Sequence, residues 1–354
     1  MEFTHQGKSL LVPIIQGGMG IGVSLGNLAG HVMKAGGLGV ISAAQPGYRD
    51  PEFKRSPIQA NLNALEVEIK KARQLSDGKG LLGINLMVAA EYYDIYAKAI
   101  SAMDIDLIIS GAGLPLELPT LVGNSTVSLA PIVSSGKAAL LLCKRWLQRS
   151  NRLPDLIIIE GPLAGGHLGF SWNQLTTLTY PSLEEILKDV LDVLKTFNVD
   201  IPIFVAGGIY TGADIARFIK LGASGVQMAT RFICTYECDA HPKFKAAFLQ
   251  SKQADIRFVI SPSGYPGRAI NNPLVEQLMA GQTVKVAHCY NCLKPCNPTT
   301  TPYCITDALI KAVSGDTDQG LIFTGVNGYR NKEIVHVHDL IQTLLNEMNE
   351  ENLV

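Results

Sequence analysis

The sequence has almost no net charge. Its 354 residues include 30 Lys and Arg against 31 Asp and Glu, which gives a formal net charge of -1 at pH 7. A chain that binds nucleic acid or an anionic membrane surface through its overall field needs an excess of positive charge. We therefore expect neither of these partners, and a small-molecule substrate instead.

Long apolar runs and a targeting segment are also missing. The apolar stretch from Leu10 to Ala44 is interrupted by many glycines and by His31 and Lys34, so it predicts short elements rather than a membrane span. Residues 1–8 lack the basic segment and apolar run of a secretory signal. With seven cysteines, which stay thiols or bind metals in a reducing compartment, these features predict a cytoplasmic protein.

Internal repeats, low-complexity tracts and a dinucleotide fingerprint are absent as well. The glycines of residues 17–22 do not have the G-x-G-x-x-G spacing of a Rossmann turn. Any NAD(P)H is therefore expected to bind transiently, without a Rossmann domain of its own.

What the chain does contain is an alternation of short apolar runs and helical patterns. The runs cover residues 11–16, 38–42, 81–85, 107–110, 127–133, 156–160, 203–206 and 225–228. Between them, apolar positions recur every three or four residues and predict helices at residues 57–75, 92–103, 138–148, 182–197 and 213–221. This alternation indicates parallel βαβ units in an α/β protein, and eight strands favour a closed (β/α)8 TIM barrel over an open sheet.

The composition changes after residue 233. Residues 234–333 are richer in Pro, Cys, Asn and Thr, with helical patterns near residues 243–251 and 303–314. We expect residues 1–233 to form the barrel and residues 234–333 a smaller C-terminal lid or substrate domain. The amphipathic tail, residues 334–354, is expected to pack back on the barrel.

The sixth apolar run leads into the most informative loop. The run ends at Glu160 and continues as Gly161-Pro162-Leu163-Ala164-Gly165-Gly166-His167. In α/β barrels the ligand site lies at the carboxyl ends of the strands. His167 is the residue of this loop that can move a proton near neutral pH, so it is the candidate for acid-base chemistry.

Other strand ends add glycines and amides at the same end of the predicted barrel. Gly17 and Gly18 follow the first run, Asn85 ends the third, and residues 206–209 and 227–231 follow the last two. Loops after strands seven and eight of a barrel commonly cradle a phosphate. Plain glycine turns are the alternative for these loops, and Asn85 could instead cap the next helix. A phosphate site, glycine-lined walls and one histidine together favour bound flavin mononucleotide (FMN) over a bare metabolite.

Four motifs carry a family resemblance. They are Gln16-Gly17-Gly18-Met19, Ala164-Gly165-Gly166-His167, Ala206-Gly207-Gly208-Ile209 and Gln227-Met228-Ala229-Thr230-Arg231-Phe232. In this order they resemble the nitronate monooxygenase family, formerly called 2-nitropropane dioxygenases, which includes flavin-dependent type II enoyl-ACP reductases. The match spans about residues 11 to 270. The resemblance implies a (β/α)8 barrel that holds FMN non-covalently beneath a smaller lid.

The resemblance also assigns roles by motif position. His167 matches the family's active-site histidine. The implied flavin contacts are Gly17, Gly18, Met19, Asn85, Glu160 and Gly165, and the implied phosphate contacts are Gly207, Gly208, Gln227, Met228, Ala229 and Thr230. Related sequences can carry Gln where this chain has Glu160, and a carboxylate there would change the electrostatics around the flavin.

The leading functional hypothesis is an FMN-dependent nitronate monooxygenase that oxidises alkyl nitronates with O2. The alternative is an NAD(P)H-dependent reductase of enoyl thioesters on the same scaffold. A flavin- or metal-binding protein without turnover is a third possibility, which the presence of His167 disfavours. The sequence leaves the physiological substrate and the oligomeric state open, a homodimer included.

Four cysteines have no role in these functional hypotheses. Cys289, Cys292, Cys296 and Cys304 have the spacing C-x2-C-x3-C-x7-C. They could bind zinc or an iron-sulfur cluster, pack as structural thiols or act in redox chemistry, and we assign no metal-binding residue. The nearby Lys294 and the more distant Arg268 could contact an anionic substrate, although basic residues mostly lie on the solvated surface.

Overall fold

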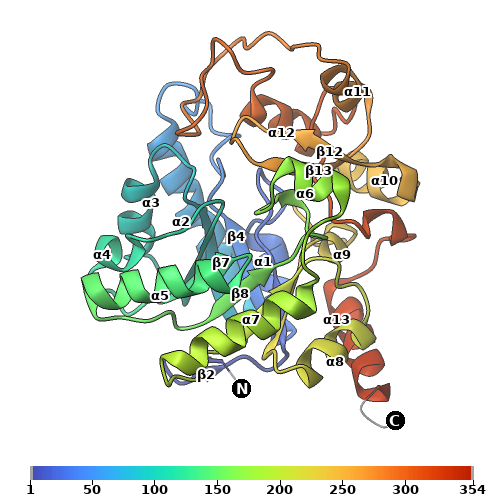
Figure 1. Ribbon diagram of the computed structural model, residues 1–354. Helices are drawn as coiled ribbons and strands as arrows, with labels where there is room; N and C mark the ends of the chain where they lie inside the picture. Colours follow the sequence, from blue (N-terminus) through green and yellow to red (C-terminus); the bar gives the residue numbers. More distant parts are fainter. Residues whose placement is uncertain (1–2, 352–354) are drawn as a thin grey trace.

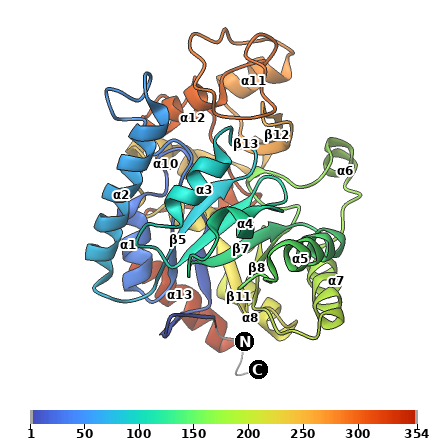
Figure 2. The same ribbon diagram turned by 90° about the vertical axis from the view of Figure 1, so that its left-hand side faces the viewer.

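A computed structural model describes residues 3–351 and contains a closed barrel of eight parallel strands (Figures 1 and 2). Around the barrel the strand order is β10-β11-β3-β4-β5-β6-β7-β8, so the last barrel strand, β11, pairs with the first, β3. Their bounds are β3 Ile14–Gln16, β4 Leu38–Ser42, β5 Leu81–Met87, β6 Leu107–Gly111, β7 Ser128–Val133, β8 Ile157–Glu160, β10 Ile203–Ala206 and β11 Gly225–Met228. The predicted TIM barrel is confirmed.

The first barrel strand, β3, is shorter than the apolar run of residues 11–16 that predicted it. The side chain of Leu11 is 67% exposed, and the backbone N–H groups of Leu11 and Val12 both donate to the Gly36 carbonyl rather than to a barrel neighbour. Before it, β1 (Thr4–His5) and β2 (Lys8–Ser9) form a small hairpin. Regular barrel pairing begins only at Ile14, where both faces of the strand become buried.

Helices surround the barrel and begin at recognisable caps. Pro57 occupies the first turn of its helix, and capping boxes start the helices after Ser182 and Thr211. The helices are α1 Gly26–Lys34, α2 Pro57–Ser76, α3 Tyr93–Ile100, α4 Leu118–Val122, α5 Gly136–Ser150, α7 Leu183–Thr196 and α8 Gly212–Lys220. Each covers the outer face of the strands with its apolar side.

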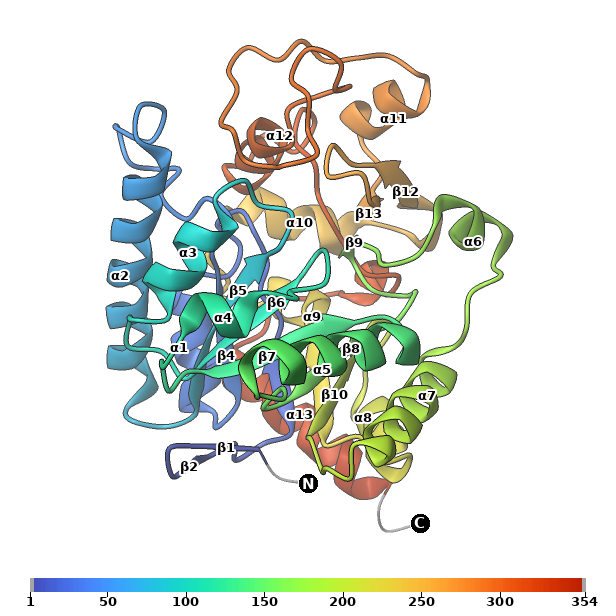
Figure 3. The ribbon, with the colours of Figure 1, turned by 60° about the vertical axis from the view of Figure 1, so that its left-hand side comes forward.

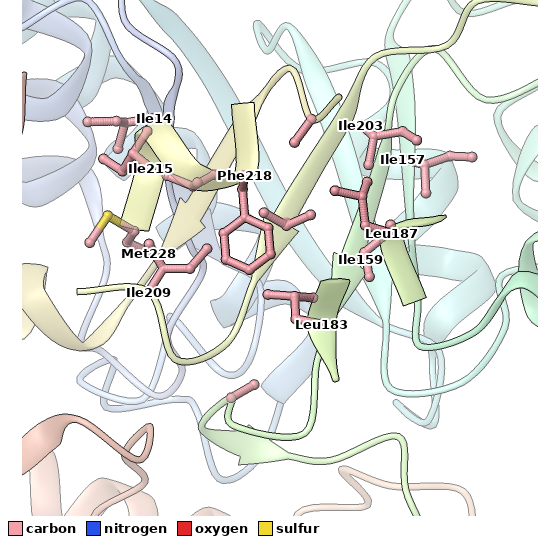
Figure 4. Close-up of a cluster of buried hydrophobic side chains, with 14 of the residues drawn as sticks. Ile14, Ile157, Ile159, Leu183, Leu187, Ile203, Ile209, Ile215, Phe218 and Met228 are labelled. Carbon is pink, nitrogen blue, oxygen red and sulfur yellow. The ribbon is translucent and has the colours of Figure 1, made fainter. Parts of the chain in front are cut away.

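The core has two layers. One cluster lies inside the barrel and includes Ile15, Val40 and Phe204. Another joins strands to helices, where Ile157 and Ile159 pack with residues of α7 and α8 such as Leu187 and Phe218 (Figure 4). Because both faces of every strand are covered, the strands are continuously apolar in sequence, as is typical of parallel sheets.

A cap of further elements covers one end of the barrel, opposite the chain termini (Figure 1). It contains α10 Pro242–Gln250, β12 Ile256–Ile260, β13 Pro266–Ile270, α11 Pro273–Met279 and α12 Ile305–Val313, with short 3-10 turns at Gln253–Asp255 and Gly328–Arg330. We call this cap the lid. Two pieces from the preceding half of the chain lie beside it, β9 (Gly166–His167) and α6 (Trp172–Thr177), and the three-stranded sheet runs in the order β12-β13-β9 (Figure 3). The division into domains at residues 233 and 234 stays a prediction.

The last helix, α13 (Val337–Glu350), lies against α8. The Gly212 N–H donates to Glu347 Oε2 over 2.6 Å, and a Cβ at Gly212 would meet the Leu344 carbonyl oxygen at 2.2 Å. This glycine therefore lets the two helices approach closely. None of the helices between residues 3 and 351 combines the length and hydrophobicity that a membrane span requires.

Candidate active site

A cavity of about 650 Å³ lies between the carboxyl ends of the barrel strands and the lid. Most of the predicted site residues line it, although they come from strands far apart in sequence. These are Gly18, Met19, Asn85, Glu160, Gly165, His167, Gln227, Ala229 and Thr230. The barrel therefore brings together loops that follow β3, β5, β8 and β11.

Gly18 is required by the close approach of β5. A Cβ at Gly18 would lie 2.4 Å from the Asn85 Cβ, well inside van der Waals contact. Gly17 is not on the cavity wall. A Cβ on Gly17 would meet the side chain of Gln227 at 3.2 Å, and the Gly17 N–H donates to the Met228 carbonyl. The wall at this point is thus bare backbone, which suits a flat ligand.

Gln227 carries an unpartnered acceptor at the cavity. Its Oε1 atom is buried and has no hydrogen-bond partner among the described residues. An unsatisfied buried amide oxygen costs about 1–3 kcal/mol, so a ligand that donates a hydrogen bond here would be favoured. Its neighbour Met228 points away into the core and is 3% exposed.

The predicted phosphate loops are covered by the lid. Gly207 and Gly208 have φ values of 101° and 84°, and a Cβ on either would meet the loop of residues 163–164 at 2.9–3.0 Å. Neither glycine lines the cavity. Thr230, the first residue of α9 (Thr230–Ile233), accepts a hydrogen bond from the Gly325 N–H at 3.1 Å through its hydroxyl. The roles of these residues in phosphate binding stay predictions.

A close contact with the lid also explains why residue 165 is a glycine. A Cβ on this residue would lie 2.4 Å from the carbonyl carbon of Thr324, so only glycine fits beneath the lid segment. Gly165 also lines the cavity. Its small size therefore serves the contact with the lid at least as much as any contact with a cofactor.

Glu160 lies on the cavity wall and has a raised pKa. Burial raises the pKa of its carboxyl to about 8, and the positive charge of Arg268 opposes this shift. At neutral pH the carboxyl is therefore mostly protonated and can donate a hydrogen bond, as the amide of a glutamine would.

Arg268 is not the solvated surface residue that we expected. It lies on β13, is only 4% exposed, and its guanidinium donates to the carbonyl oxygens of Pro162 and Ala164. It also lies 4.9 Å from the Phe258 ring centroid. Arg268 thus anchors the loop that connects Glu160 to His167. Arginine forms such forked contacts when desolvated, which composition alone could not indicate.

His167 is held by the lid. It forms β9, pairs with Gly267 of β13, and its Nε2 lies 2.8 Å from Ser261 Oγ. The Phe323 ring lies 5.2 Å away in an edge arrangement. Burial lowers the pKa of His167 to about 4, so the imidazole is neutral at physiological pH.

Sequence reasoning missed Ser261, which is 94 positions away from its histidine partner. Its side chain is 2% exposed and also accepts a hydrogen bond from the Ser263 hydroxyl at 3.0 Å. The Ser261-Pro262-Ser263-Gly264 segment has the composition of a turn. Only the pairing of β9 with β13 shows that this turn meets His167.

The described residues 3–351 contain no three His, Cys, Asp or Glu side chains placed to hold a single metal ion. All seven cysteines are unpaired thiols. Cys143, Cys234 and Cys238 are buried, whereas the four cysteines of the lid are partly or fully exposed.

Comparison with known proteins identifies the family. A family model for nitronate monooxygenase matches residues 4–347. A probable nitronate monooxygenase from Staphylococcus aureus strain Newman is 28% identical over 306 residues, which cover 76% of this chain and 78% of that protein.

Solved structures share the fold over nearly the whole chain. FabK from Thermotoga maritima superposes with a TM-score of 0.74 at 24% identity, covering 97% of this chain and 94% of that one. Nitroalkane oxidase from Streptomyces ansochromogenes gives a TM-score of 0.74 at 20% identity and covers 97% of both chains. With the family model matching almost its full length, the chain belongs to the nitronate monooxygenase family of oxidoreductases.

Proposed function

We propose that this protein is an FMN-dependent oxidoreductase that oxidises alkyl nitronates with O2. The observation that carries the proposal is a neutral, half-buried histidine on the wall of a glycine-lined cavity of about 650 Å³ at the carboxyl end of a TIM barrel. A cytoplasmic location and a homodimer stay predictions.

The cavity fits a flavin. Gly18 leaves bare backbone where any Cβ would collide with Asn85, and the orphaned Gln227 Oε1 offers an acceptor for a ring N–H. Among the predicted contacts that line the cavity, we assign the ring to Gly18, Met19, Asn85, Glu160, Gly165 and Gln227, and the phosphate to Ala229 and Thr230. Gly17, Gly207, Gly208 and Met228 do not line the cavity and receive no contact with the flavin in this proposal. When bound, FMN supplies a two-electron acceptor that O2 can reoxidise.

His167 supplies the proton chemistry. The Ser261 hydroxyl engages Nε2, while Nδ1 has no hydrogen-bond partner within residues 3–351 and is the nitrogen left to a substrate. As a neutral imidazole it can take a proton from an acidic carbon next to a nitro group. Where the substrate is already a nitronate, the ring orients its oxygens. The lid elements around His167 exclude water, which strengthens both the proton transfer to the imidazole and its contact with the nitronate oxygens.

Reduction of enoyl thioesters with NAD(P)H is the second candidate. FabK, a structural neighbour, is an enoyl-ACP reductase. The cavity also extends along apolar side chains, among them Leu86, Met87 and Leu114, where an acyl chain could lie. Such a lining suits a longer substrate than a small nitronate needs.

Steady-state assays of the purified chain separate the two functions. Oxygen uptake with an alkyl nitronate, at a rate that does not depend on added NAD(P)H, supports the monooxygenase. NAD(P)H oxidation coupled to loss of an enoyl thioester, without nitronate turnover, would overturn it in favour of the reductase. Mass spectrometry of the released cofactor tests FMN, and a chain that takes up no flavin would contradict both enzymes.

A further inference from the structure

The tip of the lid is an irregular segment, residues 280–304, between α11 and α12 (Figures 1 and 3). One isolated bridge, Ala90 to Leu293, ties it to the loop after β5. Two backbone hydrogen bonds accompany the bridge, from Lys294 N to the Ala89 oxygen at 2.9 Å and from Glu91 N to the Cys292 oxygen at 3.2 Å. Long irregular segments inside compact proteins usually bind something or act as lids.

All four cysteines of this segment line one small cavity. Cys289, Cys292, Cys296 and Cys304 line a space of about 340 Å³, although up to fifteen positions separate them along the chain. Cys292 also lines the active-site cavity, so the two cavities share a wall. None of the four forms a disulfide.

Packing does not account for this arrangement. Structural thiols behave as small apolar groups and fill the space between their neighbours. Here a space remains among the thiols, and Cys289 is exposed. Four cysteines that line one cavity indicate a ligand between them.

The size of the space among the cysteines distinguishes between metal centres. A structural zinc ion needs four ligand atoms within about 2.3 Å of one point. A space of about 340 Å³ is larger than one such ion fills. In a four-iron cluster each cysteine binds its own iron, so the ligands surround a volume rather than a point.

We propose that Cys289, Cys292, Cys296 and Cys304 bind an iron-sulfur cluster in the lid. Each thiol releases one proton to solvent as its sulfur bonds to one iron, and the cluster crosslinks the irregular segment to the start of α12. The proposal is independent of the nitronate reaction, because none of these thiols is assigned to flavin or substrate.

Metal analysis of the full chain tests the proposal. The protein is purified without oxygen, incubated with equal amounts of ferrous and ferric salt and with sulfide, and desalted. We expect iron and acid-labile sulfide in equal amounts, about four of each per chain. No retained iron after this treatment, or retention of zinc alone in the protein as purified, would overturn the proposal.

Cysteine variants locate the cluster. Cys292→Ala and Cys296→Ala should lose the bound iron and sulfide, whereas Cys143→Ala, which alters a buried thiol on α5, should keep both. Circular dichroism and flavin content show whether each variant folds. A folded Cys296→Ala protein with the iron and sulfide of the parent would refute the assignment, and if a variant fails to fold, the analysis of the parent chain still decides.

Discussion

Replacing Glu160 by Gln should make the stability of this protein less dependent on pH. Burial raises the pKa of the carboxyl from 4.5 to about 8. The unfolded chain therefore loses this proton near pH 4.5, while the folded chain keeps it until about pH 8. The folded state binds more protons in this window, so the free energy of unfolding falls as the pH rises through it.

The expected size follows from the shift. Each unit by which the pH exceeds 4.5 lowers the free energy of unfolding by about 1.4 kcal/mol until the pH reaches the pKa of the folded state. The loss caused by Glu160 is therefore absent below pH 4.5, reaches about 3 kcal/mol at pH 7 and levels off near 5 kcal/mol above pH 8. Glu160→Gln keeps the shape and cannot ionise. The free energy of unfolding of the variant should therefore exceed that of the parent chain by these amounts at each pH.

Urea unfolding of the flavin-free proteins, followed by circular dichroism from pH 4.5 to 9, measures the difference. Glu333→Gln, which removes an exposed carboxylate, serves as the control and should follow the parent chain within about 0.5 kcal/mol. A difference in the free energy of unfolding between Glu160→Gln and the parent that stays constant across this range would show that Glu160 does not keep its proton in the folded chain.

Three further predictions concern turnover and cofactor binding. His167→Gln should retain FMN but lower kcat about 10²- to 10⁴-fold, and unchanged turnover would remove its catalytic role. Ser261→Ala removes the hydroxyl 2.8 Å from Nε2, so we expect a smaller loss of kcat with a shifted pH profile of kcat/KM; an unaltered profile would show that this contact does not position the ring. Gly18→Ala places a methyl group 2.4 Å from the Asn85 Cβ and should weaken FMN binding, measured by fluorescence titration. Adding Asn85→Gly, which removes the Cβ that the new methyl group meets, should recover part of the affinity. An equal Kd for Gly18→Ala and the parent would contradict the assigned ring site.

The barrel could be predicted because its strands carry a local signal. Runs such as residues 156–159 are continuously apolar, since helices cover one face and the barrel interior the other. The amphipathic helices between them were equally visible. The observed α7, Leu183–Thr196, differs from its predicted range by a single residue at each end.

The lid could not be predicted in the same way, because its contacts join distant residues. The hairpin of β12 and β13 lies in a segment rich in Gly and Pro, and its third strand, β9, is two residues long. The buried state of Arg268 and the contact between Ser261 and His167 both depend on this sheet. A single sequence does not contain the register that brings these segments together.

Anaerobic mixing of the flavin-loaded protein with an alkyl nitronate tests the proposed function most directly. We expect the flavin absorbance to bleach with the nitronate alone and to return when O2 is admitted, and His167→Gln to slow the first step. A flavin that stays oxidised with nitronate but is reduced by NADH or NADPH, and is reoxidised by an enoyl thioester, would contradict the proposed nitronate oxidation.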